Sequence, residues 1–167
     1  MKNKYKQNIL DRAIAINPKI ILPEVDDRRI NTAIKELESI GFNIIHPMDI
    51  NKNKFIDSAY NKTFTNNWTQ EMIESYLACP LNLSLFALDD GQVDCLIAGA
   101  KYKTSDVIRS SIRIVGIKNS VNWISSVFIM LSSNNADFFT FTDCAVIPDP
   151  SIEQLSGIAY EASKIHE

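Results

Sequence analysis

Short apolar runs alternate with longer segments of helical periodicity through the first 115 residues. Residues 19–22, 43–46 and 95–98 are apolar-biased runs of a length typical of buried strands. Apolar residues at helical spacing follow the first run: Ile30, Ala33, Ile34, Leu37 and Ile40. Strands that alternate with helices pair in parallel and carry helices on both faces. The sequence therefore predicts an α/β fold, a three-layer sandwich with a mainly parallel sheet.

The last third of the chain has a different pattern. Residues 121–131 and 138–142 favour strands, and the polar turn at residues 132–135 between them predicts a β-hairpin. A helix with one apolar face is predicted over residues 152–164. The hairpin and this helix are too few elements to form a complete domain.

Chain length limits how many cores these elements can build. At 167 residues, 46% of them hydrophobic, the chain can bury one core and part of a second. We predict an N-terminal α/β domain over residues 1–115 and the start of a second, partial α/β domain over residues 116–167. The apolar faces of the second portion have few elements to cover them, so we expect a homo-oligomer.

Charge and cysteine usage exclude several classes of partner. The net charge of −3, from 17 basic and 20 acidic residues, gives no general field for nucleic acid or an anionic membrane. Cys79, Cys95 and Cys144 are odd in number, and their spacing does not fit a metal site. No apolar stretch approaches the roughly 18 residues of a membrane span. We expect a cytoplasmic protein with reduced thiols, no metal, and neither nucleic acid nor membrane as a partner.

The stretch DCLIAGAKYKTSDVIR, residues 94–109, reads as a strand, a polar loop and the start of a helix. Ligands of open α/β sheets bind at the carboxyl ends of strands, and loop amides at a helix N-terminus favour an anion. Side chains suited to phosphate gather here: Lys101, Lys103, Thr104, Ser105 and Arg109. An ordinary lysine-bearing surface loop would have a similar composition.

A charged turn follows the first predicted strand. Acids in the first turn of a helix favour its positive end, so we expect Asp26 or Asp27 to cap the following helix. Arg28 and Arg29 either edge a nucleotide site or pair with these acids. Farther along, the Asn- and Lys-rich residues 51–69 are expected to form a mobile, partly ordered loop.

Three stretches in this chain, in this order, resemble the phosphate acetyl/butyryl transferases, or phosphotransacetylases. They are ILPEVDDRRINTA at residues 21–33, the strand, loop and helix at residues 94–109, and FTDCAVIPDPSIEQLSGIAYEA at residues 141–162. The resemblance covers nearly the whole chain and corresponds to the N-terminal half to two-thirds of a full-length family member. Val25 stands where the family usually has a glycine.

The resemblance implies transfer of an acetyl or other short acyl group between coenzyme A and inorganic phosphate. Coenzyme A is then a substrate, and no cofactor is implied. Thr104 and Arg109 match the family positions that contact the acyl phosphate, so they are the candidate catalytic residues, about one helical turn apart. Lys103 and Ser105 join them as candidate phosphate- and substrate-binding residues. Lys103 either supplements Arg109 or is simply solvated.

Other residues fit the family pattern less directly. Asp143 and Cys144 lie in the segment that borders the family's cleft, and Cys144 is otherwise a small buried thiol. Asp106 is expected to cap the helix that carries Arg109. Lys62 alone stands near a basic segment that helps family members hold coenzyme A.

The resemblance leaves open whether the chain is catalytically active, because some family residues have no match in it. A further family arginine and the aspartate proposed as thiol base have no counterpart in these 167 residues. Without a base a thiol is only a few per cent ionised at neutral pH, so we expect at most a trace of turnover, with protection against heat by phosphate. The alternative is a truncated, catalytically inactive remnant that acts as a small-anion-binding or protein-interaction module.

Overall fold

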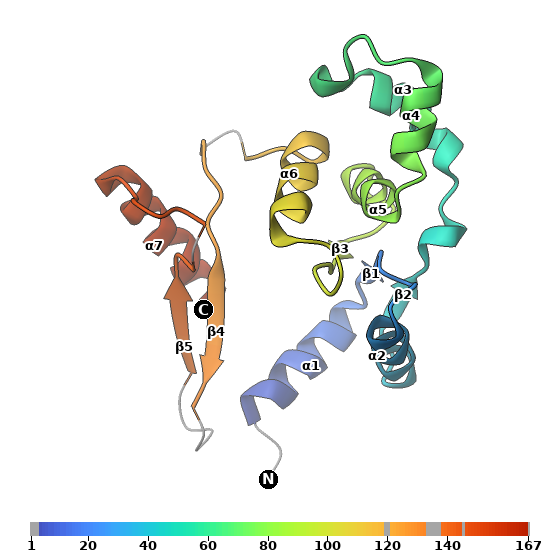
Figure 1. Ribbon diagram of the computed structural model, residues 1–167. Coiled ribbons are helices and arrows are strands. Elements are labelled where there is room, and N and C mark those ends of the chain that lie inside the picture. The colour runs from blue at the N-terminus through green and yellow to red at the C-terminus, as the bar shows by residue number, and fades with distance from the viewer. Residues whose placement is uncertain (1–3, 119–120, 133–137, 145, 167) are drawn as a thin grey trace. The chain divides into compact units, whose positions relative to one another are not determined.

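The computed structural model describes residues 4–118, 121–132, 138–144 and 146–166 (Figure 1). Its contacts divide the chain into two compact units. One unit is Asp11–Gly116, and the other joins Met1–Leu10 to Ile117–Glu167. The first helix, α1 (Lys4–Ile16), therefore begins in one unit and ends in the other. No helix among the described residues is long and apolar enough to cross a membrane.

A parallel three-stranded sheet forms the centre of the larger unit. Its strands are β1 (Lys19–Ile21), β2 (Asn43–Ile45) and β3 (Cys95–Leu96), in the order β2-β1-β3. In β1, Ile20 pairs with Ile44 on one side and with Cys95 on the other. The parallel pairing predicted from the βα alternation is confirmed.

Helices cover both faces of this sheet, because alternate residues of β1 point to opposite sides. Ile21 is fully buried in a cluster with α4 (Gln70–Leu77), α5 (Pro80–Asp89) and α6 (Thr104–Ile114). Ile20 and Leu22 are buried against Ile34 of α2 (Arg28–Ser39) on the other face. Figure 1 shows α2 and α5 on opposite sides of the strands. The predicted three-layer arrangement is confirmed.

The segment between β2 and α4 is more ordered than the mobile loop expected for residues 51–69. It contains short helices: η1 (Pro47–Asp49), η2 (Lys52–Phe55), α3 (Ile56–Tyr60) and η3 (Thr63–Thr65). Phe55 is 2% exposed in the core, and the Phe64 ring contacts those of Trp68 and Tyr76. The expectation was wrong because three of the aromatic side chains of this polar segment, Phe55, Phe64 and Trp68, pack against the core.

The smaller unit contains an antiparallel hairpin and a helix. β4 (Val127–Leu131) pairs with β5 (Phe138–Thr142), with Phe128 opposite Phe141, and α7 (Ile152–His166) packs on β5. The hairpin is confirmed, but its first strand begins at Val127 rather than at residue 121. Ser126, just before β4, instead forms hydrogen bonds with the side chains of Thr142, the last residue of β5, and Asp143, which follows it. Most of the expected turn, residues 133–135, lies outside the described residues.

Candidate functional site

The loops that follow β1 and β3 meet at the carboxyl end of the sheet. The chain passes from β1 through α2 to β2 on one side, whereas β3 lies on the other side of β1. The strand order therefore reverses between β1 and β3. In open α/β sheets such a reversal opens the crevice in which ligands bind.

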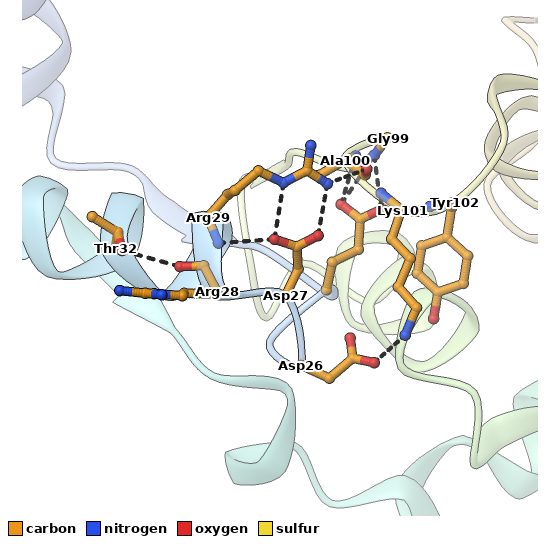
Figure 2. Close-up of polar contacts among 10 residues, drawn as sticks. Asp26, Asp27, Arg28, Arg29, Thr32, Gly99, Ala100, Lys101 and Tyr102 are labelled. Carbon is orange, nitrogen blue, oxygen red and sulfur yellow. Dashed lines mark hydrogen bonds and ion pairs between the residues drawn. The ribbon is translucent and has the colours of Figure 1, made fainter.

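A carboxylate of the chain itself occupies the loop after β3. Glu24 is 1% exposed, and its oxygens accept hydrogen bonds from four successive backbone N–H groups. The donors are Gly99 at 3.1 Å, Ala100 at 3.0 Å, Lys101 at 2.6 Å and Tyr102 at 2.7 Å. Figure 2 labels the four donor residues, Gly99 to Tyr102, beside the turn that carries Asp26 and Asp27. The anion that these amides favour is thus Glu24, which corrects the expectation that the loop amides would hold a ligand.

The pKa of Glu24 reflects two opposing effects. Burial raises it, but the hydrogen bonds from Tyr102, Lys101, Ala100 and Gly99 favour the ionised form and together prevail. The pKa is therefore below its ordinary value, and Glu24 is a buried carboxylate that stays charged.

An ion pair and a hydrogen bond also join the loop after β3 to the turn after β1. The Lys101 ammonium forms an ion pair with Asp26, and an Arg29 Nη donates to the Ala100 carbonyl at 2.7 Å. Arg29 also forms a two-point pair with Asp27, at 3.0 and 2.7 Å. These contacts clamp the loop after β3 against the turn after β1 (Figure 2).

The alternatives left open for the charged turn are now resolved in part. Asp27 caps α2, because its carboxylate accepts the Arg29 N–H at 2.8 Å. Hydrogen bonds from the side chain and backbone of Arg29 lower the pKa of Asp27 to about 2. Arg29 pairs with Asp27 but not with Asp26, whose partner is Lys101, and the Arg28 side chain points away from both acids in Figure 2.

The start of α6 presents the candidate phosphate-binding residues to solvent. Lys103 is the N-cap residue and makes no capping hydrogen bond with its side chain. Lys103, Thr104 and Ser105 are all exposed, and the side chain of Arg109 is 58% exposed. The first N–H groups of an α-helix have no partner within the helix, so an uncapped start suits an anion.

Arg109 and Thr104 do not share one face of α6. Five residues correspond to about 1.4 turns, so the spacing is wider than the single turn expected. Arg109 Nη1 lies 3.2 Å from an oxygen of Asp106, three residues earlier. Asp106 therefore pairs with Arg109. The prediction that Asp106 caps the helix was wrong, because the N-cap residue is Lys103. Helical side chains lean toward the N-terminus, which directs Arg109 back toward Thr104.

Asp143 and Cys144 lie in the smaller unit. The Asp143 carboxylate accepts the N–H and Oγ–H of Ser126, at 2.7 and 2.8 Å, and the N–H groups of Val146 and Ile147, at 3.0 and 2.6 Å. Burial raises the pKa of Asp143, but these hydrogen bonds outweigh it and the pKa is lowered. The carboxylate therefore fixes the segment after β5.

Cys144 is half-buried rather than fully buried, and its N–H donates to Ser126 Oγ at 2.8 Å. Asp143 and Cys144 border a surface hollow of about 620 Å³, together with Phe128, Met130 and Phe141. The hollow is mainly apolar, so nothing in it marks either residue as a substrate contact.

Lys62 has a structural position. Its ammonium is 2.7 Å from a carboxylate oxygen of Asp89 and donates to the Ile114 carbonyl at 2.5 Å. Cations favour the negative end of a helix, and Ile114 is the last residue of α6. Lys62 therefore stabilises the end of α6 and is not a free cation for coenzyme A.

Sequence reasoning identified the loop and the helix but missed Glu24, which organises them. A signal was present: Glu24 directly follows the apolar residues 20–23 at the end of a strand. An acid in that position is either solvated or bound by backbone donors. The described residues contain no group of three or more His, Cys, Asp or Glu side chains that could hold a metal ion.

Comparisons with known proteins agree on one family. The sequence profile described as phosphate acetyl/butaryl transferase matches residues 35–167. The phosphate acetyltransferase of Treponema pallidum is 40% identical over 51% of this chain and 27% of the relative. That of Acetivibrio thermocellus is 26% identical over 98% of this chain and 58% of the relative.

Solved structures give the same fold. A phosphotransacetylase from Streptococcus pyogenes superposes on 99% of this chain and 59% of its own, with a TM-score of 0.82 and 23% identity. The EutD phosphotransacetylase from Staphylococcus aureus matches with a TM-score of 0.81 over 94% of this chain and 55% of its own, at 24% identity. The chain thus spans less than two thirds of each of these proteins.

Proposed function

The chain belongs to the phosphate acetyl/butaryl transferase family, and from that premise we propose that it acts in acyl transfer between coenzyme A and inorganic phosphate. The substrates are an acyl phosphate with a short acyl group, such as acetyl, together with coenzyme A and phosphate. No cofactor takes part in this proposal. The alternative, an inactive remnant that binds small anions or proteins, receives no support from the comparisons.

One observation carries the proposal: α6 begins without a side-chain cap, and exposed cationic and hydroxyl groups surround its start. Thr104 and Ser105 offer hydroxyl donors, and the first N–H groups of the helix favour negative charge. Arg109 supplies a planar, bidentate donor for phosphate oxygens once it leaves Asp106. Exchanging an exposed carboxylate for a phosphate costs little, since exposed ion pairs are weak.

The same groups fit the charge that develops during acyl transfer. Donors fixed near the acyl phosphate stabilise negative charge on its oxygens and on the carbonyl oxygen under attack. Thr104 is the candidate donor to the reacting group, and Arg109 is the candidate phosphate anchor. Lys103 directly precedes Thr104 and adds positive charge at the start of α6.

The thiol of coenzyme A also needs to lose a proton. Two of the acids near this site have partners in the loops: Glu24 binds backbone amides and Asp26 binds Lys101. Proton removal is then left to solvent, which forfeits acid–base assistance worth about 10²–10⁴ in rate. We therefore expect slow turnover from this chain alone, with substrate binding retained.

Release of coenzyme A from acetyl-CoA, measured with a thiol reagent with and without phosphate, tests the proposal. We expect a trace of phosphate-dependent release that Thr104→Ala abolishes and that the matched control Thr63→Ala, at another exposed threonine, leaves unchanged. Phosphate and acetyl phosphate should raise the melting temperature of the wild type. If the wild type showed no release of coenzyme A and no thermal shift with either ligand, the proposal would be overturned.

We also propose that the chain associates with a second copy through the hairpin. Phe128, Met130, Phe139 and Phe141 share one face by register and alternation, and each is more than half exposed. Contiguous apolar side chains on a sheet face are typical of contact surfaces, and an identical copy offers the same face for a two-fold interface.

A further inference from the structure

We propose that Glu24 is a positioning residue for phosphate binding at the start of α6. This inference rests on the proposed function. Glu24 does not touch the phosphate in this account, because its carboxylate is 1% exposed and already has its hydrogen-bond partners. It acts through the loop of residues 99–102, which leads directly into Lys103 and Thr104.

The hydrogen bonds fix the backbone of this loop residue by residue. Four successive N–H groups converge on one carboxylate, at 2.6–3.1 Å for the shortest bond from each. Successive amides normally point in different directions, so this convergence requires one particular backbone path. Gly99 has a backbone φ of +115°, a value that residues other than glycine rarely adopt. Glycine at this position therefore allows the chain to turn.

Other contacts hold the loop of residues 99–102 on its polar side and on its apolar side. On the polar side, the turn that carries Glu24 also provides Arg29 for the Ala100 carbonyl and Asp26 for Lys101. On the apolar side, the Tyr102 ring packs against the core, with its hydroxyl 3.8 Å from Cys79 Sγ. The residue after Tyr102 is the N-cap of α6. The direction of the first N–H groups and of the Thr104 hydroxyl therefore depends on where Glu24 holds the loop.

The burial of Glu24 makes its charge essential to this role. A neutral glutamine fills the same space, but its NH₂ group is a donor that would face donors. Some of the four amides would then lose their acceptor, and the loop would have to move to find another. A displacement of about 1 Å at a binding site is enough to cost on the order of 10²-fold in rate.

The test compares Glu24→Gln, Glu24→Asp and the control Glu36→Gln, which removes the same charge from an exposed residue of α2. Phosphate affinity is measured by calorimetry at a temperature at which circular dichroism shows each variant folded. Amide exchange at residues 99–102 is followed by NMR in the same samples. A purely structural role would lower the melting temperature and leave the phosphate affinity of the folded protein unchanged.

We expect the dissociation constant for phosphate to rise about tenfold or more in Glu24→Gln, by less in Glu24→Asp, and not at all in Glu36→Gln. Exchange at residues 99–102 should accelerate in the same order. Unchanged affinity in folded Glu24→Gln would overturn the inference while leaving the proposed function intact. If Glu24→Gln does not fold, wild-type affinity in Glu24→Asp, whose carboxylate is one methylene short, overturns it equally. A wild type that binds neither phosphate nor acetyl phosphate would overturn the proposed function and this inference together.

Discussion

Glu24 and Tyr102 are 78 residues apart in the chain, yet a Glu24 carboxylate oxygen accepts the Tyr102 N–H at 2.7 Å. This hydrogen bond joins the turn after β1 to the loop after β3, two strands that pair in parallel. A buried carboxylate thus joins the two loops at the carboxyl end of the sheet. The candidate phosphate site begins at Lys103, the residue after Tyr102.

Acid should destabilise the protein partly through Glu24. Its pKa is lowered by folding, so the unfolded chain binds more protons as the pH falls below the ordinary value of 4.5. The stabilisation is complete above that pH and is lost as the pH falls through the lowered pKa. Urea unfolding of the wild type and Glu24→Gln should therefore show a difference in unfolding free energy that is large at about pH 7 and shrinks in acid.

Asp26, Asp27 and Asp143 also have lowered pKa values and add to the acid sensitivity of the wild type. The comparison of the two proteins isolates Glu24 from these groups. A difference in unfolding free energy that stays constant from neutral pH down through the acid range would contradict the assignment of Glu24 as a buried, ionised carboxylate.

Asp143 should matter for stability through the segment after β5. Asp143→Asn leaves the N–H groups of Val146 and Ile147 with a poorer acceptor, and we expect a loss of about 1–3 kcal/mol, measured by urea unfolding followed through tryptophan fluorescence. Asp149→Asn, at an exposed position in the same segment, is the control and should change stability by less than about 0.5 kcal/mol. Equal effects of the two substitutions would show that the contacts of Asp143 are not important for the folded state.

Lys62 should stabilise the protein without contributing to coenzyme A binding. Lys62→Met removes the donor to Asp89 and to the Ile114 carbonyl, and we expect a loss of about 1–3 kcal/mol in urea unfolding. Lys54→Met, at an exposed lysine of the same segment, is the matched control. A large loss of coenzyme A affinity in folded Lys62→Met, seen by calorimetry, would restore the role in coenzyme A binding suggested by the sequence.

Self-association should depend on the exposed face of the hairpin. Light scattering coupled to size-exclusion chromatography should give the mass of a dimer for the wild type and of a monomer for Phe128→Glu. A buried, unpaired charge opposes association strongly. The control Tyr60→Glu places the same charge at an exposed aromatic residue of the larger unit. A wild type that is monomeric at high concentration would contradict the proposed interface.

The order of the larger unit's elements could be predicted from the sequence because periodicity reports burial directly. Ile20 to Leu22 and the apolar stripe of α2 carry a local signal, and the parallel sheet follows from their alternation. The cap at Asp27 was predictable for the same reason, since acid and helix start are adjacent. The prediction of a mobile loop at residues 51–69 was wrong, because it followed the polar composition and overlooked the few side chains that pack inward.

The candidate site was only half predictable. The helix start at Thr104 and the nearby cations are neighbours in sequence, so local reasoning finds them. The hydrogen bonds from the Lys101 N–H to Glu24 and from the Lys62 ammonium to the Ile114 carbonyl join residues 77 and 52 positions apart. No local pattern specifies such pairs, which depend on how the strands bring the loops together. Sequence reasoning therefore identified the groups that could bind phosphate and missed the groups that hold them in place.

Calorimetric titration of acetyl phosphate into the wild type, Arg109→Lys and Arg113→Lys tests the central claim most directly. Arg109→Lys keeps the charge and loses the bidentate donor, so affinity should fall about tenfold. Arg113 lies one turn farther from the start of α6, and its replacement by lysine should leave affinity unchanged. Wild-type affinity in Arg109→Lys, or an equal loss in both variants, would contradict a phosphate site at the start of α6.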